Sequence, residues 1–220
     1  MKISATALIG AIAACVALTT LGLVEWLGSR ASIDAGFWYE GQLPALSIDD
    51  TARIDGPLTA SELERIRQIS RAEVRRAFSG LRITVTDGAN AFWRVAVVGA
   101  PPRTVSLRRY PFATAGQSHV FGPLGGFGSV GFLVLAHNAI AHAGPSAARE
   151  DIVAGIGRGV GRSAVHEFAH QALGVDNWAN IDNRTDLTSY EYWNADRTSQ
   201  YYGELRWGTA WPVLYRKFGK

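Results

Sequence analysis

Two histidines and a glutamate in the last third of this 220-residue chain have the spacing of a metal site. His166 and His170 stand four residues apart in the segment AVHEFAHQ, residues 164–171. On a helix this spacing places both imidazoles on one face, one turn apart, where they can bind the same zinc ion. Glu167 would face the open coordination position and accept a proton from the water that zinc activates. The pattern predicts a zinc-dependent hydrolase with Glu167 as general base.

The residues around these three side chains are typical of a buried helix. Val165, Phe168 and Ala169 are apolar, and Gly174 follows at a position where glycine can end the helix. The alternative interpretation of the same residues is an ordinary core helix whose histidines form hydrogen bonds and bind no metal.

This segment resembles the active-site helix of the zincin metallopeptidases, whose HExxH signature is matched by His166, Glu167 and His170. The resemblance covers that helix and its neighbourhood. It implies a sheet packed on the helix, a peptide or protein substrate lying along an edge strand, and hydrolysis of peptide bonds.

A catalytic zinc ion usually has three protein ligands and one open position, so a third ligand is expected. In the gluzincin arrangement a glutamate on a second helix supplies it, and Glu191 stands 21 residues beyond His170. In the metzincin pattern the third ligand stands six residues beyond the second histidine, which is the position of Asp176. There, however, the pattern's glycine falls one position late, at Gly174, and the only methionine is Met1. We therefore favour Glu191 over Asp176.

Two further side chains are candidates for the catalytic site. Tyr201 and Tyr202 have phenol groups that could stabilise a tetrahedral oxyanion. The alternative for both is a packing role, since the last third of the chain is rich in aromatic residues.

Four alternate glycines, from Gly155 to Gly161, precede the motif. They lack the lysine and the spacing of a phosphate-binding loop. We expect them to let this helix, or a loop leading into it, pack closely against the sheet.

The remaining chain indicates an α+β fold, with a small mixed β-sheet packed on the HExxH helix and a helical C-terminal part. Thr59 and Glu62 form a capping box at the start of one helix, and residues 81–98 alternate like two strands of a hairpin. The expected elements are helices at 59–80 and 146–174 and strands at 81–86, 92–98, 104–109 and 130–136.

The N-terminal residues 1–28 are expected to form a transmembrane anchor or a signal segment. The run from Ile3 to Gly28 is almost entirely apolar, with Lys2 before it and Glu25 near its end. A signal cleaved near residue 31, and lipidation at Cys15, are the alternatives. Each places the main domain outside the cytoplasm, membrane-anchored or secreted.

We expect residues 29–58 to form a spacer and residues 59–220 to form the metallohydrolase domain. The net charge of +3 comes without a long basic run, which argues against a nucleic-acid partner. The single cysteine, Cys15, excludes zinc knuckles and thiol catalysis from the domain.

Two other functions fit the same residues. One is a membrane-anchored, non-catalytic module that binds a partner through a zincin-like fold. The other is a zinc hydrolase that cleaves a non-peptide amide, such as a cell-wall fragment.

Overall fold

A computed structural model describes residues 32–99, 116–121, 124–174, 200–204, 207–208 and 210–220. Apart from residue 32, all of the described residues belong to one compact unit, Ile33–Lys220. The unit confirms the expected mixture of helices with a mixed β-sheet. The expected N-terminal helix and the expected strand at 104–109 lie outside the described residues.

In the part of the chain that the structure describes, five strands form one sheet in the order β2-β1-β3-β5-β4. The strands β2, β1, β3 and β5 are mutually parallel, and only the edge strand β4 runs antiparallel to its neighbour β5. Among the described residues, β4 pairs with a strand on one side only, which makes it an edge strand of this sheet. The strands are β1 (Ile33–Tyr39), β2 (Ile83–Thr86), β3 (Trp93–Val98), β4 (Gly116–Val120) and β5 (Gly126–Gly131).

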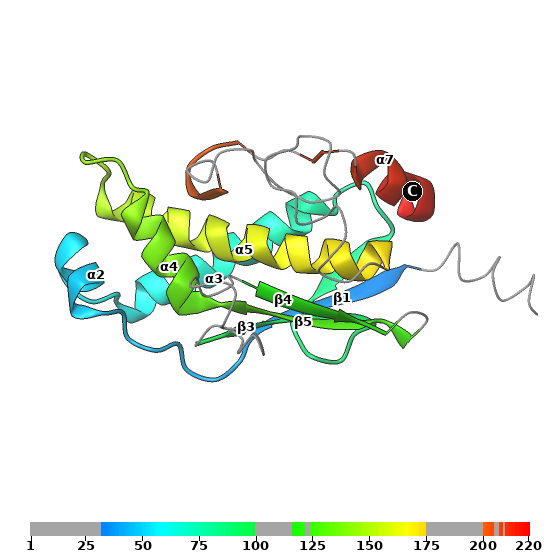
Figure 1. The fold of residues 1–220 in the computed structure, drawn as a ribbon, viewed down its shortest axis with the longest axis horizontal. Coiled ribbons are helices and arrows are strands. Elements are labelled where there is room, and N and C mark those ends of the chain that lie inside the picture. Colours follow the sequence, from blue (N-terminus) through cyan, green and yellow to red (C-terminus); the bar gives the residue numbers. More distant parts are fainter. Residues whose placement is uncertain (1–31, 100–115, 122–123, 175–199, 205–206, 209) are drawn as a thin grey trace, which may run out of the picture. The chain divides into compact units, whose positions relative to one another are not determined.

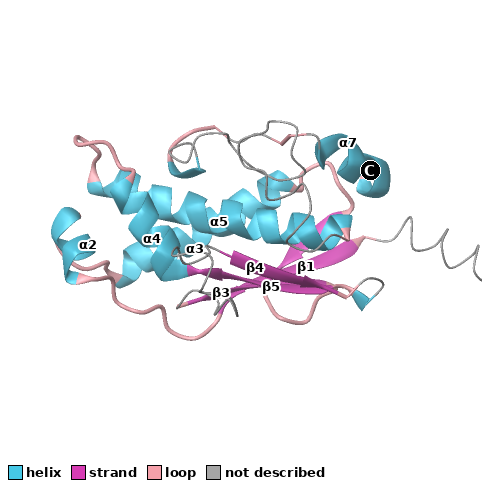
Figure 2. Ribbon diagram, viewed as in Figure 1, coloured by secondary structure: helices cyan, strands magenta, loops and turns pink. Residues whose placement is uncertain are grey.

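Two long helices, α3 and α5, lie side by side on one face of the sheet (Figure 1). The apolar side chains that point from the sheet into this layer, among them Phe37, Val95 and Val130, are completely buried. Figure 2 shows the same layering, with the helices on one side of the strands. The helices are α2 (Ile48–Arg53), α3 (Ala60–Ala77), α4 (Phe132–Ala141), α5 (Arg149–Leu173) and α7 (Ala210–Phe218).

The helices expected at 59–80 and 146–174 are both present, as α3 and α5. The capping box of α3 is formed as expected, with the Thr59 amide donating to Glu62 Oε2 at 2.8 Å and the Glu62 amide donating to Thr59 Oγ1 at 3.2 Å. Helix α5 ends at Gly174, which has a left-handed φ of 72°. Glycine is favoured there because it has no Cβ to oppose that conformation.

The expected hairpin at residues 81–98 is wrong. The strands β2 and β3 are parallel and do not pair, because β1 lies between them. The connection from β2 to β3 crosses β1 at Gly36, where an added Cβ would collide with the carbonyl oxygen of Gly88. Residues 33–39, which fall in the expected spacer 29–58, form β1, a central strand of the sheet.

The strand expected at residues 130–136 is also wrong for all residues after Gly131. Strand β5 ends at Gly131, and helix α4 begins directly at Phe132. An apolar run of this length does not distinguish a buried strand from a buried helix.

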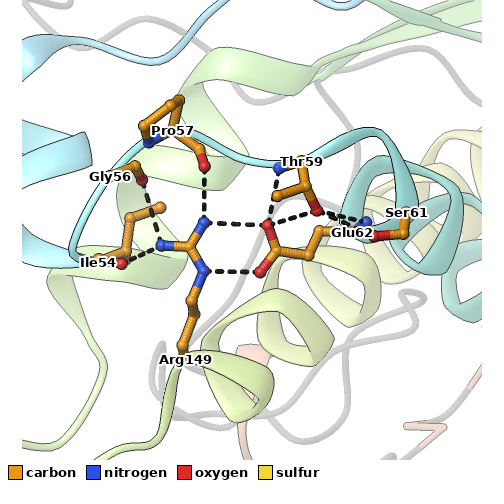
Figure 3. Close-up of polar contacts among 7 residues, drawn as sticks. All are labelled: Ile54, Gly56, Pro57, Thr59, Ser61, Glu62 and Arg149. Carbon is orange, nitrogen blue, oxygen red and sulfur yellow. Dashed lines mark hydrogen bonds and ion pairs between the residues drawn. The ribbon is translucent and has the colours of Figure 1, made fainter.

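Arg149, the first residue of α5, joins three parts of the chain (Figure 3). Its guanidinium donates two hydrogen bonds to the Glu62 carboxylate, at 2.6 and 3.0 Å. It also donates to the backbone carbonyls of Ile54, Gly56 and Pro57. The start of α5 is thereby fixed to the start of α3 and to the turn before it.

Candidate metal centre

The two histidines of the motif lie on the last two turns of α5 and face each other. The Nε2 atoms of His166 and His170 are 3.1 Å apart, and the ring planes cross at 83°. His166 is 7% exposed and His170 is completely buried. The helical spacing has therefore brought the two imidazoles together on one face, as the sequence predicted.

This separation of the nitrogens fits two positions of a tetrahedral zinc site. With Zn–N bonds of about 2.0–2.1 Å, two ligating nitrogens in a tetrahedron stand about 3.3 Å apart. The observed 3.1 Å is also a normal distance for a direct hydrogen bond between two neutral imidazoles. The geometry is thus compatible with a shared metal ion or with a shared proton.

Glu167 lies between α5 and the edge strand β4. It is only 3% exposed, and a Cβ placed on Gly116 of β4 would overlap its Oε1 atom. Gly128 of β5 is also close, since a Cβ there would lie 3.2 Å from the Glu167 Cβ. Two glycines thus leave the space on the sheet that this carboxylate side chain occupies.

A further side chain, Gln171, connects this part of α5 to two strands. Its Oε1 accepts from the Arg94 amide and its Nε2 donates to the Arg94 carbonyl, both at 3.0 Å. The same Nε2 donates to Ser118 Oγ at 3.1 Å, and Ser118 Oγ donates to the Glu167 carbonyl at 3.2 Å. The bonds fix the helix on β3 and β4 at the turn that carries the motif.

The sequence interpretation did not single out Gln171. A signal was present, because Gln171 stands four residues after Glu167 and therefore shares its helix face. A polar residue on the face that meets the sheet needs a hydrogen-bonding partner there.

Both candidates for the third metal ligand, Glu191 and Asp176, fall in 175–199, outside the described residues. Within the described ranges, no group of three or more His, Cys, Asp or Glu side chains is arranged to hold a metal ion. The histidine pair thus offers two nitrogen atoms with the spacing of zinc ligands.

The structure does not bring Tyr201 and Tyr202 to the histidine pair. The Tyr201 ring packs at Gly159, and the Tyr202 ring packs at Gly155, both nearer the start of α5 than His166. The Tyr202 hydroxyl donates to the Ala139 carbonyl. Burial raises the pKa of Tyr202 to about 12. The contacts of both rings with α5 are packing contacts.

The alternate glycines of α5 serve two different faces. Gly155 and Gly159 make room for the two tyrosine rings, and a Cβ on Gly157 or Gly161 would overlap α3. The expected close packing is present, but the partners are α3 and the tyrosines, whereas the sequence interpretation named the sheet.

Comparison of the chain with protein-family models, with curated proteins and with solved structures finds no match.

Proposed function

We propose that this chain is a zinc-dependent hydrolase of peptide bonds, attached to a membrane through its N-terminal segment. The single observation that carries the proposal is the pair of buried Nε2 atoms, His166 and His170, held 3.1 Å apart. The neighbouring carboxylate of Glu167, buried against strand β4, supports it. We keep Glu191 as the proposed third ligand, with Asp176 as the alternative.

The chemistry that zinc supplies when bound is Lewis acidity towards the substrate carbonyl and a lower pKa, about 7, for a water molecule. His166 and His170 would hold the ion. The Glu167 carboxylate would accept the water proton and pass it to the leaving amine nitrogen. Because Glu167 is buried, the surrounding dielectric is low and its electrostatic interactions are stronger than in water.

Within the described part of the chain β4 is paired on one side only, and this supports a peptide as the substrate. An extended peptide can add to such an edge as a further strand through backbone hydrogen bonds. The side chain of Glu167 lies directly against Gly116 of this strand, so a bound peptide would pass close to the proposed base.

The proposed membrane attachment rests on the apolar run from Ile3 to Gly28. That run lies outside the described residues. Among the residues that are described, no helix is long and apolar enough to cross a bilayer.

A non-catalytic partner-binding module remains the second candidate. The observation that favours it is the same 3.1 Å contact, interpreted as a direct hydrogen bond within a metal-free core.

The first experiment measures the zinc content of the full chain, purified without added metal, beside two variants. We expect about one zinc ion per chain, lost in His166→Ala and kept in His119→Ala, which removes an exposed histidine on β4. The zinc-loaded chain is then assayed on peptides, with Glu167→Gln expected to keep zinc and lose activity. A folded chain that takes up no zinc on titration would contradict the hydrolase and favour the binding module.

A further inference from the structure

The four parallel strands begin at the same end of the sheet, which we call the starting edge. Because β1, β2, β3 and β5 are parallel, all begin at the same edge, with Ala35 opposite Trp93 and Trp93 opposite Gly126. Figure 1 shows β1 and β5 beginning at the same end of the unit. Helix α2 lies at the other end, where it contacts α4, the helix that follows the end of β5.

Large apolar side chains are exposed at this starting edge. Phe92 is 41% exposed, Phe121 is 49% exposed and Leu124 is 78% exposed. Backbone hydrogen bonds place them together: Gly126 donates to the Phe92 carbonyl at 3.1 Å, and Leu124 donates to the Phe121 carbonyl at 3.2 Å. We call these three residues the apolar edge. A cluster of this kind is typical of a surface that binds a partner.

Basic side chains lie at the same end. The chain after α7 runs beside the start of β2, where Lys220 donates its amide to the Gly80 carbonyl at 3.2 Å. The Phe218 ring meets the Trp93 ring at 5.2 Å, which places this segment at the start of β3 as well. Asp34, exposed on β1, offsets part of the positive charge. The exposed cations of this segment are Arg216, Lys217 and Lys220.

The covalent chain ties this edge to the apolar N-terminal run. Gly28 ends the run and Ile33 begins β1, so five peptide steps separate them. Five steps span at most about 18 Å. If the run crosses a bilayer, the start of β1 cannot be farther than this from the end of the run, and the edge that carries it stays near the membrane surface.

We propose that the folded unit contacts the bilayer with this edge. The side chains of Phe92, Phe121 and Leu124 enter the interfacial region, where apolar surface leaves water. Arg216, Lys217 and Lys220 face the headgroups of the leaflet on the unit's own side, where anionic lipids attract cations within about a Debye length. The inference rests on the proposed membrane attachment and is independent of zinc binding.

The contact would also place the histidine pair close to the membrane. Gln171, the residue after His170, bonds to Arg94, the second residue of β3. The motif therefore lies at the level of the starting edge, and substrates would be met at the bilayer surface.

The test uses the full chain in lipid vesicles, with Cys15→Ser as background because Cys15 is the only cysteine. A polarity-sensitive fluorophore is attached at Leu124→Cys. The matched control is Ile48→Cys on α2, which is 87% exposed at the other end of the unit. In vesicles of phosphatidylcholine and phosphatidylglycerol we expect blue-shifted emission at 124. Lipids that carry a nitroxide on the headgroup should quench the fluorophore at 124 severalfold more strongly than the fluorophore at 48.

The charge contribution is tested with Arg216→Gln, Lys217→Gln and Lys220→Gln combined, and with vesicles of phosphatidylcholine alone. Either change should weaken the quenching at 124 severalfold. Equal quenching at 124 and 48 would overturn the proposal. So would a blue shift at 124 that grows with the protein-to-lipid ratio, because it would report contact with a second copy of the chain. A chain that does not float with the vesicles would overturn it as well. Zinc content measured on the same samples reports separately on the hydrolase, since an unquenched 124 with one zinc ion per chain would overturn only the membrane contact.

Discussion

The position of Glu167 depends on the absence of a side chain at Gly116. The Oε1 atom of Glu167 occupies the place where a Cβ of residue 116 would lie, and the carboxylate is 3% exposed. A general base must be held within hydrogen-bond reach of the proton that it removes. At this residue the sheet, and not only the helix, fixes the proposed base.

Gly116→Ala should therefore lower activity without removing the metal. We expect kcat for any peptide that the zinc-loaded chain cleaves to fall about 100-fold, because a displacement of about 1 Å can cost that much. Zinc content should stay unchanged, since the added methyl group points at Glu167. Gln117→Ala, on the neighbouring residue of β4, should leave kcat nearly unchanged; equal losses in both variants would contradict this account of Glu167.

The arrangement of His166, Glu167 and His170 could be predicted because it depends only on the period of one helix. The bonds of Gln171 could not, because its partners Arg94 and Ser118 come from strands more than fifty residues away in the chain. The sequence allowed the face of Gln171 to be predicted, while the partners on that face depend on the sheet order.

At the scale of elements, α5 combines a low intrinsic helix propensity with close packing. A glycine in a helix interior costs about 1 kcal/mol relative to alanine, and α5 contains four at alternate positions. In return α3 approaches the backbone of α5 at Gly157 and Gly161, and two aromatic rings pack at Gly155 and Gly159. Buried contacts, rather than propensity, hold this helix together.

Gly161→Ala should destabilise the fold, although alanine is the better helix former. An added Cβ would lie 2.6 Å from the Ser70 carbonyl oxygen and 2.7 Å from the Glu73 Cβ, and the backbone of α3 cannot yield easily. We expect a net loss of about 1–3 kcal/mol in the free energy of unfolding, measured by chemical denaturation. Gly144→Ala, which has open space around it, should change it by less than about 0.5 kcal/mol. Equal stability of the two variants would contradict the packing argument.

Strand order was the part of the fold that local pattern could not provide. Residues 81–86 and 92–98 alternate like adjacent strands, and the short connection between them favours a hairpin. The third strand, β1, comes from fifty residues earlier and lies between them. Its sequence, IDAGFWY, lacks the alternation of a half-buried strand, because a central strand is buried on both faces around Gly36.

At the scale of the whole molecule, Arg149 ties together elements that are far apart in sequence (Figure 3). The hydrogen bonds from Arg149 are the largest cause that lowers the pKa of Glu62, from 4.5 to about 2. The Thr59 amide and hydroxyl act in the same direction. A carboxyl group whose pKa is lower in the folded chain than in the unfolded chain stabilises the fold only while it is ionised.

Glu62→Gln should accordingly remove a stabilisation that depends on pH. At pH 6 we expect the variant to lose about 1.5–3 kcal/mol in the free energy of unfolding, since bonds to a charged group are replaced. Glu62 contributes fully above its unfolded pKa of 4.5, and the contribution disappears as the pH falls towards about 2. The difference between wild type and variant should therefore shrink across that window, which denaturation at a series of pH values measures.

Glu64→Gln, which removes an exposed carboxyl group 3.6 Å from Arg67, should cost less than about 1 kcal/mol at any pH. A difference at Glu62 that stays constant from pH 6 to pH 2 would show that the ionised carboxylate is not what holds α3 to α5.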